Sequence, residues 1–139
     1  MNLTAEQKLE IHELLSRASY AYDTRDTDML ASCFAEDATM SMRIAGGELA
    51  GPFVGRDAIM ELMAGSMAQQ TDVRRHVVSN LFFLAGAAGI RVNSFLTLIA
   101  TENSQTALLT TGVYQDTVVQ DEAGNWRLSA RHLDLDNAY

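Results

Sequence analysis

The sequence is poor in the residues that usually hold small extracellular proteins together. Its 139 residues include one cysteine, Cys33, and one proline, Pro52. A single cysteine cannot form an intramolecular disulfide, so the fold must depend on an apolar core. A domain of this length buries roughly two thirds of the surface of its unfolded chain, which is sufficient without covalent links. We expect Cys33 to be a buried helix residue.

Long apolar runs and an N-terminal targeting pattern are also missing. The longest apolar stretch, residues 81–90, is interrupted by glycines. It is shorter than the roughly 18 residues that a membrane-spanning helix requires. The first residues, MNLTAEQKLE, have neither the basic start nor the apolar segment of a signal peptide. We therefore expect a soluble, cytoplasmic protein with no membrane partner.

Basic residues are scarce relative to acidic ones. The chain has 10 Lys and Arg against 18 Asp and Glu, a net charge of −8. A phosphate backbone would be repelled, so we expect no nucleic-acid partner. The sequence also lacks a glycine-rich phosphate loop, a Gly-x-Ser-x-Gly motif, and the His-x-x-x-His or Cys-x-x-Cys spacing of metal sites. We therefore expect no metal and no cofactor.

The N-terminal half shows helical periodicity. Thr4 and Gln7 have the form of a capping box, and apolar residues then recur at helical spacing, which predicts a helix over residues 4–22. A short second helix is predicted with Thr27 as its N-cap and its end near Glu36 and Asp37. A third helix is predicted over residues 56–67, with methionines on its apolar face.

The C-terminal half changes to a period of two. Its β-branched stretches predict four strands joined by hairpins, over residues 74–84, 89–101, 105–120 and 125–136. Two shorter strands are predicted earlier, over residues 38–44 and 49–54, and Pro52 places the second at a sheet edge. Helices followed by an antiparallel meander predict an α+β class. We expect a single domain over residues 1–139, a cone in which a curved, mixed but mostly antiparallel sheet wraps around the N-terminal helices.

Two titratable residues stand next to apolar segments. Asp23 directly follows Tyr22, the last apolar residue of the first helical stripe. Its carboxylate either faces a pocket or begins the solvated turn TRDTD. In the strand RRHVVSNLFF, a period of two puts His76, Asn80 and Phe82 on one face. His76 is a core or edge histidine when taken alone, but beside a carboxylate it becomes a usable base.

The remaining histidines and the tryptophan carry weaker signals. His12 lies off the apolar stripe of the first helix, so we expect it at the surface. His132 alternates with Leu128 and Ala130 on the last strand, which predicts an inward side chain that lines the pocket. Trp126, after the turn DEAGN, is expected to be a packing anchor.

Five segments together resemble a known family. They read YAYDTRDTDMLASCFAEDATMSM, GRDAIMELM, RRHVVSNLFF, TTGVYQDTV and GNWRLSARHLDLD. In this order the chain resembles the SnoaL-like branch of the nuclear transport factor 2-like superfamily, whose members include scytalone dehydratase and a dehydrochlorinase. The resemblance covers nearly the whole chain and implies the cone-shaped fold. In dehydratase-like members it also implies a catalytic pair, an aspartate just after the first helix and a histidine early in the third strand.

Asp23 and His76 match that pair, so the resemblance implies that they are the catalytic residues. The expected substrate-binding residues are Tyr22, Met42, Asn80 and His132. Met42 stands where scytalone dehydratase would carry a second pocket tyrosine, and no histidine lies between His76 and His132 to match its second catalytic-site histidine. These departures favour a different, small hydrophobic ring compound as substrate.

The expected activity is cofactor-free proton abstraction by a lyase or isomerase. His76, held by Asp23, would remove a proton next to a carbonyl or aromatic ring while a leaving group departs or a double bond moves. Tyr22 and Asn80 would donate hydrogen bonds to the developing oxyanion. Two alternatives stay open: a noncatalytic binding or oligomeric subunit, like the small subunit of ring-hydroxylating dioxygenases, and an isomerase with a carboxylate alone as base. We also expect a homo-oligomer, either a dimer or a trimer.

Overall fold

The computed structural model describes residues 2–139, which form three helices and one curved six-stranded sheet. The helices are α1 (Ala5–Thr24), α2 (Thr27–Ser32) and α3 (Arg56–Gln69). The strands are β1 (Phe34–Ile44), β2 (Ala50–Val54), β3 (Val73–Gly86), β4 (Gly89–Glu102), β5 (Gln105–Gln120) and β6 (Trp126–Leu135). The α+β class is therefore confirmed.

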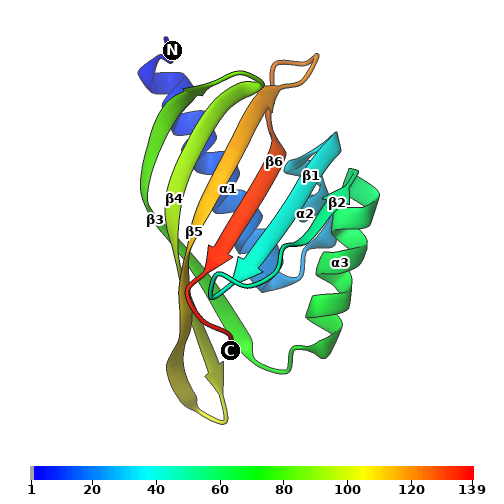
Figure 1. Cartoon of the computed structure of the whole chain (residues 1–139), viewed down its shortest axis with the longest axis vertical. Helices are drawn as coiled ribbons and strands as arrows, with labels where there is room; N and C mark the ends of the chain where they lie inside the picture. Colours follow the sequence, from blue (N-terminus) through cyan, green and yellow to red (C-terminus); the bar gives the residue numbers. More distant parts are fainter. Residues whose placement is uncertain (1) are drawn as a thin grey trace.

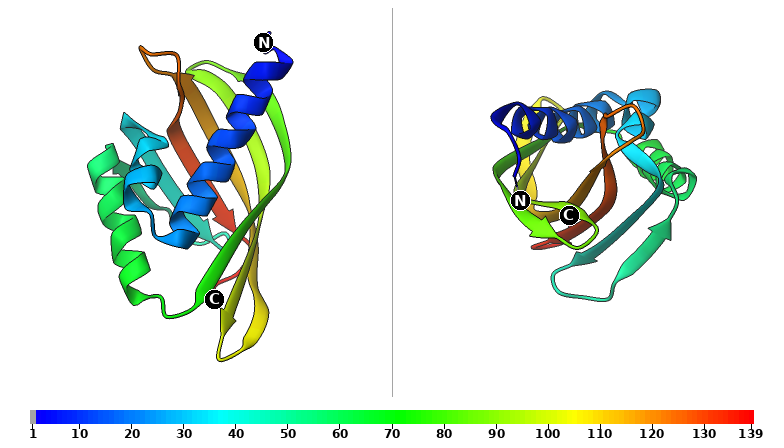
Figure 2. Two further views of the ribbon diagram at one scale, coloured as in Figure 1. Left: turned by 180° about the vertical axis from the view of Figure 1, so that it is seen from behind. Right: turned by 90° about the horizontal axis from the view of Figure 1, so that it is seen from above.

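The sheet has the order β2-β1-β6-β5-β4-β3 and is mixed. All neighbouring strands are antiparallel except β1 and β6, which are parallel. Helix α1 crosses one face of the sheet, while α2 and α3 lie beside β1 (Figure 1). Seen from above, the sheet curls around an interior that α1 covers (Figure 2). This is the cone-shaped arrangement predicted from the sequence.

Helix α1 begins at the predicted capping box and ends at Thr24, two residues later than predicted. The Thr4 hydroxyl accepts from the Gln7 backbone N–H at 3.1 Å, and the Gln7 side chain accepts from the Thr4 N–H at 3.0 Å, so the predicted capping box is present. Its C-cap is Arg25, whose φ of 57° is left-handed. Asp23 therefore lies in the last helical turn rather than after it. The apolar face of α1 packs on the sheet through Ile11, Leu14, Leu15, Ala18 and Ala21.

The second helix is shorter than the sequence predicts: it ends at Ser32 instead of near Glu36 and Asp37, and β1 already begins at Phe34. Its N-cap also differs from the prediction. Asp26, not Thr27, is the N-cap of α2, because its carboxylate accepts from the Met29 N–H at 3.0 Å. Cys33 is buried at the C-terminal end of this helix, and burial raises the pKa of its thiol. Pro52 lies on β2, the edge strand, as predicted. Among residues 2–139, no helix is long and apolar enough to cross a membrane.

A β-bulge in β3 reverses the alternation that the sequence predicts. The pairing of β3 with β4 shifts between Ser79 and Phe82, and Asn80 adopts a left-handed φ of 55°. Beyond this point Leu81 and Phe83 pack on the core, whereas Phe82 is 51% exposed and Asn80 is exposed. The prediction that Asn80 and Phe82 share the inner face with His76 is therefore wrong, because one extra residue changes the parity of the strand.

A second bulge has the same effect in β6. Thr117 pairs with Ala130 and Val118 pairs with Leu128, so Ser129 is the extra residue. After it, Leu133 and Leu135 are buried, and His132 points to the other face of the sheet. The predicted inward orientation of His132 is wrong for this reason. The same shift brings its neighbour Arg131 into the interior.

The left-handed backbone at Asn80 predicts which substitutions the β3 bulge tolerates. Replacing Asn80 with glycine should change the free energy of unfolding by no more than about 0.5 kcal/mol, because glycine adopts positive φ without a steric penalty. Asn80→Val should destabilise the protein by about 1–2 kcal/mol, because a β-branched residue is disfavoured there. Urea unfolding measures both. Thr97→Val, a substitution on β4 at a residue without a positive φ, is the control. Equal free energies of unfolding for the two Asn80 variants would contradict a left-handed backbone at Asn80.

Candidate active site

Asp23 holds His76 through both of its carboxylate oxygens. Oδ1 lies 2.6 Å from Nδ1 of the imidazole, and Oδ2 accepts from the His76 backbone N–H at 2.7 Å. Both side chains are largely buried, with 7% of Asp23 and 14% of His76 exposed. Because a carboxylate only accepts hydrogen bonds, Nδ1 carries the proton of this contact and Nε2 is left as the free ring nitrogen.

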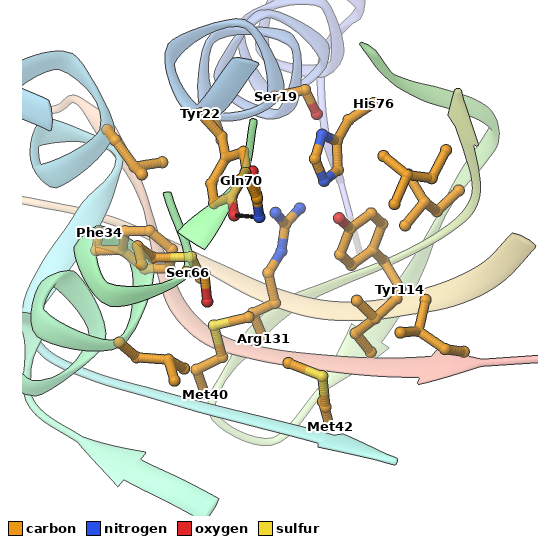
Figure 3. A pocket seen from close by; sticks show the side chains of 18 of the residues that line it. Ser19, Tyr22, Phe34, Met40, Met42, Ser66, Gln70, His76, Tyr114 and Arg131 are labelled. Carbon is orange, nitrogen blue, oxygen red and sulfur yellow. Dashed lines mark hydrogen bonds between the residues drawn. The ribbon is translucent and has the colours of Figure 1, made fainter. Parts of the chain in front are cut away.

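His76 lines an internal cavity between α1, α3 and the concave face of the sheet. The cavity offers about 110 Å³ to the centres of water-sized molecules, several times the ~10–15 Å³ that one water requires. The imidazole is directed into it (Figure 3). Much of the wall is apolar and consists of Leu30, Phe34, Met40, Met42, Leu62, Met63, Leu96, Leu98, Leu133 and Leu135. A small hydrophobic compound is the kind of ligand that such a cavity suits.

Tyr22 forms part of the wall beside His76. The two rings meet edge to face, with centroids 4.9 Å apart. The Tyr22 hydroxyl accepts a hydrogen bond from Nε2 of Gln70 at 2.6 Å, a contact drawn in Figure 3. Burial raises the pKa of Tyr22, so the phenol keeps its proton and can donate it to a ligand.

Arg131 lies in the wall of the same cavity, although the sequence did not single it out. Its Nε and Nη2 donate to the two carboxylate oxygens of Asp116 at 2.8 and 2.9 Å, and both residues are buried. Burial acts to lower the pKa of Arg131, but the charge and hydrogen bonds of Asp116 outweigh it and hold the pKa above its usual value. The guanidinium therefore remains a permanent cation. The period-two alternation counted backwards from Leu133 and Leu135 puts Arg131 on the inner face, whereas the alternation counted forwards from Trp126 puts it on the outer face.

Two further hydroxyl groups lie in the polar part of the cavity wall. Tyr114 is 4% exposed, and the Arg131 guanidinium lies 4.0 Å from the centroid of its ring. Ser19 on α1 is also buried, and its Oγ has no partner within residues 2–139. Figure 3 shows both hydroxyls on the side of the cavity occupied by His76 and Arg131. A base, a cation and two hydroxyls thus converge on one region.

The residues predicted from the sequence divide into two groups. Asp23 and His76 are in contact, and Tyr22 and Met42 line the cavity with His76. Asn80 is exposed at the bulge and is not part of the cavity wall. His132 lies outside the cavity, with Nδ1 2.7 Å from the Ser41 hydroxyl and Nε2 3.1 Å from Asp134. The catalytic and binding roles of these residues stay predictions.

No group of three or more His, Cys, Asp and Glu side chains with the arrangement of a metal site occurs in the described part of the chain, residues 2–139.

Tyr114 predicts a specific loss of stability at high pH. Burial raises its pKa to about 12, compared with 10.0 for the unperturbed phenol. The folded state therefore binds this proton more tightly than the unfolded state, so stability is retained below about pH 10 and falls as the pH approaches 12. Urea unfolding between about pH 10 and pH 12 should show this fall in the free energy of unfolding, and the fall should be smaller in Tyr114→Phe. An unchanged pH dependence in the variant would contradict the burial of this phenol.

Solved structures with the same fold have low sequence identity to this chain. One is a protein of unknown function with a cystatin-like fold from Nostoc punctiforme (24% identity, TM-score 0.81, covering 98% of this chain and 96% of that one). Another is a protein provisionally named a scytalone dehydratase from Novosphingobium aromaticivorans (26%, 0.73, 93% and 83%). A third is ActVI-ORFA from Streptomyces coelicolor (18%, 0.80, 95% and 98%). None of the curated proteins matches the sequence.

The sequence also matches a protein family directly. The match is to the SnoaL-like domain and extends over residues 3–132, nearly the whole chain. It agrees with the cone-shaped fold and confirms the resemblance found in the sequence. The chain belongs to the SnoaL-like domain family.

Proposed function

We propose that the protein is a cofactor-independent lyase or isomerase, dehydratase-like in its chemistry, that acts in the cytoplasm on a small aromatic or polycyclic substrate. The observation that carries this proposal is the 2.6 Å contact between Asp23 and His76 at the wall of a largely apolar cavity. A histidine oriented by a carboxylate and facing such a cavity is the arrangement expected of a general base.

In this proposal His76 removes a proton from a carbon next to a carbonyl group or aromatic ring. Nε2 accepts the proton, and the Asp23 carboxylate stabilises the positive charge that the imidazole then carries. The negative charge moves to the substrate oxygen. Arg131 and Tyr22 take the oxyanion-stabilising role that the sequence suggested for Tyr22 and Asn80, because both line the cavity and Asn80 does not.

The apolar wall supports this chemistry in two ways. It lowers the local dielectric, so the field of Arg131 on a developing negative charge is screened less than it would be in solvent. Met40, Met42 and Met63 in the wall are unbranched and flexible, which suits ring systems of different shape. A neutral ring compound with one activating oxygen fits this combination of surfaces.

Replacing either member of the pair should strongly reduce proton abstraction. His76→Gln and Asp23→Asn should each slow exchange of the α-hydrogens of bicyclic aromatic ketones with deuterium by roughly 100- to 10,000-fold, measured by NMR. Both substitutions keep the approximate shape of the side chain, so thermal unfolding should show a retained fold.

His132→Gln is the matched control for these variants, because His132 lies outside the cavity and should leave the exchange rate unchanged. Exchange by the His76 variant at the wild-type rate would show that His76 is not the base. Normal exchange by the Asp23 variant would show that the carboxylate has no part in it.

A second candidate function, assembly with another protein chain, is favoured by the outer face of the sheet. Phe82 and Phe95, each 51% exposed, lie on the paired strands β3 and β4, and Val77 is also exposed there. Aromatic residues that remain exposed on adjacent strands are frequent in protein interfaces. We propose that copies of this chain associate through this face as a dimer or trimer.

The assembly proposal predicts a change in molecular mass. Sedimentation analysis of the wild type should give a dimer or trimer, and the double variant Phe82→Ser with Phe95→Ser should give a monomer, because the apolar contact area is lost. Tyr20→Ser, an exposed aromatic residue on α1, is the control and should keep the wild-type mass. A monomeric wild type would exclude the interface.

A further inference from the structure

The proposed function names a base but leaves the departing group without a proton donor. We propose that Tyr114 is a further catalytic residue, which donates its phenolic proton to the leaving hydroxyl when a β-hydroxy carbonyl compound loses water. This inference rests on the proposed function, because the elimination begins with proton abstraction by His76.

The position of Tyr114 supports a role toward a ligand. Its side chain comes from β5 into the cavity, on the inner face of the sheet, and is 4% exposed. Within residues 2–139 the hydroxyl forms no hydrogen bond of the kind that fixes Tyr22 to Gln70. Figure 3 shows it directed toward the space between His76 and Arg131. The Tyr114 hydroxyl has no hydrogen-bond partner among the described residues, so its proton is free for a ligand oxygen in the cavity.

The other polar groups of the cavity are less suited to transfer a proton to a leaving group. The Arg131 guanidinium is held in its charged form by Asp116, so it donates hydrogen bonds without releasing a proton. Ser19 is an aliphatic alcohol and a weaker acid than a phenol. His76 receives the substrate proton, and the Tyr22 hydroxyl, which accepts from Gln70, donates its own proton to the substrate oxyanion in the proposed function. Tyr114 is the phenol whose hydroxyl is uncommitted.

Arg131 makes the transfer from Tyr114 feasible. Burial keeps Tyr114 protonated before the reaction, with a pKa of about 12. Water, the conjugate acid of the departing hydroxide, is a weaker acid than the phenol, so proton transfer from Tyr114 to that oxygen is favourable. The phenolate that forms lies beside the guanidinium, whose carbon is 4.0 Å from the centroid of the ring. The positive charge therefore stabilises the anionic state of Tyr114 when the proton leaves.

The proposed step conserves atoms and electrons. His76 Nε2 takes the α-proton, and the electron pair of that C–H bond becomes the new carbon–carbon double bond. The β-carbon–oxygen bond breaks, and the oxygen takes its electron pair together with the proton of Tyr114, so water leaves. The imidazolium of His76 and the phenolate of Tyr114 then return to their starting states by proton transfer, directly or through the released water. No oxidant, reductant or cofactor is needed.

The experiment compares leaving groups that differ in their need for a proton. A β-hydroxy-β-phenyl ketone and the matched β-acetoxy ketone are followed by the absorbance of the enone that both produce. Deuterium exchange at the α-carbon of the parent phenyl ketone, which has no leaving group, is followed by NMR. The proteins are the wild type, Tyr114→Phe, His76→Gln, and Tyr20→Phe as a control at an exposed tyrosine.

Tyr114→Phe should slow loss of the hydroxyl group by roughly 100- to 10,000-fold, the usual effect of removing a positioned acid. Loss of acetate and deuterium exchange should stay within roughly threefold of the wild type, because acetate departs without a proton. His76→Gln should slow all three reactions, and Tyr20→Phe none. Thermal unfolding should show that Tyr114→Phe is folded, since the oxygen removed bonds to no other described residue.

Other outcomes overturn either this inference or the proposed function. Equal slowing of all three reactions by Tyr114→Phe would mean that the phenol serves the carbonyl oxygen, and unchanged rates would mean that it serves neither group; each result rejects the inference. Wild-type exchange without loss of the hydroxyl group rejects it as well. Unchanged reactions in His76→Gln, or a wild type inactive toward all three compounds, reject the proposed function itself.

Discussion

The Asp23 carboxylate joins the end of α1 to the inner face of β3, and the geometry of the cavity depends on this connection. One of its oxygens accepts from the backbone of His76 and the other from its ring. The dipole of α1 disfavours a negative charge in its last turn, so the two hydrogen bonds must offset that cost. The position of the helix on the sheet and the orientation of the imidazole are therefore fixed by the same side chain.

Apolar burial provides most of the stability around that contact. Ile11, Leu15 and Ala18 lie on the sheet-facing side of α1, above inward residues of the curved sheet such as Val92 and Val118. Each buried aliphatic side chain contributes about 1.5–3 kcal/mol relative to an exposed one. The sheet leaves a cavity because α1 covers one part of its concave face while α2 and α3 lie beside β1 (Figure 2).

The buried pair of Arg131 and Asp116 gives the cavity a permanent positive charge. A buried ion pair is a weak source of stability, because both ions lose their hydration. The geometry of this ion pair nevertheless holds the Arg131 guanidinium against the ring of Tyr114, in the wall of the cavity that His76 also lines. The base and the cation thus come from β3 and β6, strands that are not neighbours in the sheet and meet only across its curvature.

The sequence predicted those features that depend on local chemistry. The capping box, the helical stripe of α1 and the edge position of Pro52 each follow from a few neighbouring residues. The resemblance to the SnoaL-like family pointed to Asp23 and His76, which lie in contact across 53 positions of the chain.

The face of the sheet toward which each side chain points was predictable only up to each bulge. Neither Asn80 nor Ser129 carries a composition signal that marks an extra residue, and each inserts one. Asn80 and His132 were therefore placed on the wrong face, and Arg131 was missed. In β6 the alternation of Leu133 and Leu135 conflicts with that of Trp126 and Leu128, which signals a change of face but not its position. The position of each bulge follows only from the pairing of β3 with β4 and of β5 with β6.

Asp23 fixes one tautomer of His76, with a free nitrogen facing the cavity. Nitrogen-15 NMR of histidine-labelled protein measures this directly, because protonated and unprotonated ring nitrogens have well-separated chemical shifts. We predict that the neutral His76 ring carries its proton on Nδ1, with Nε2 unprotonated, and that Asp23→Asn alters this pattern. A neutral ring protonated on Nε2 would contradict it, since the nitrogen that faces the substrate could then not accept a proton.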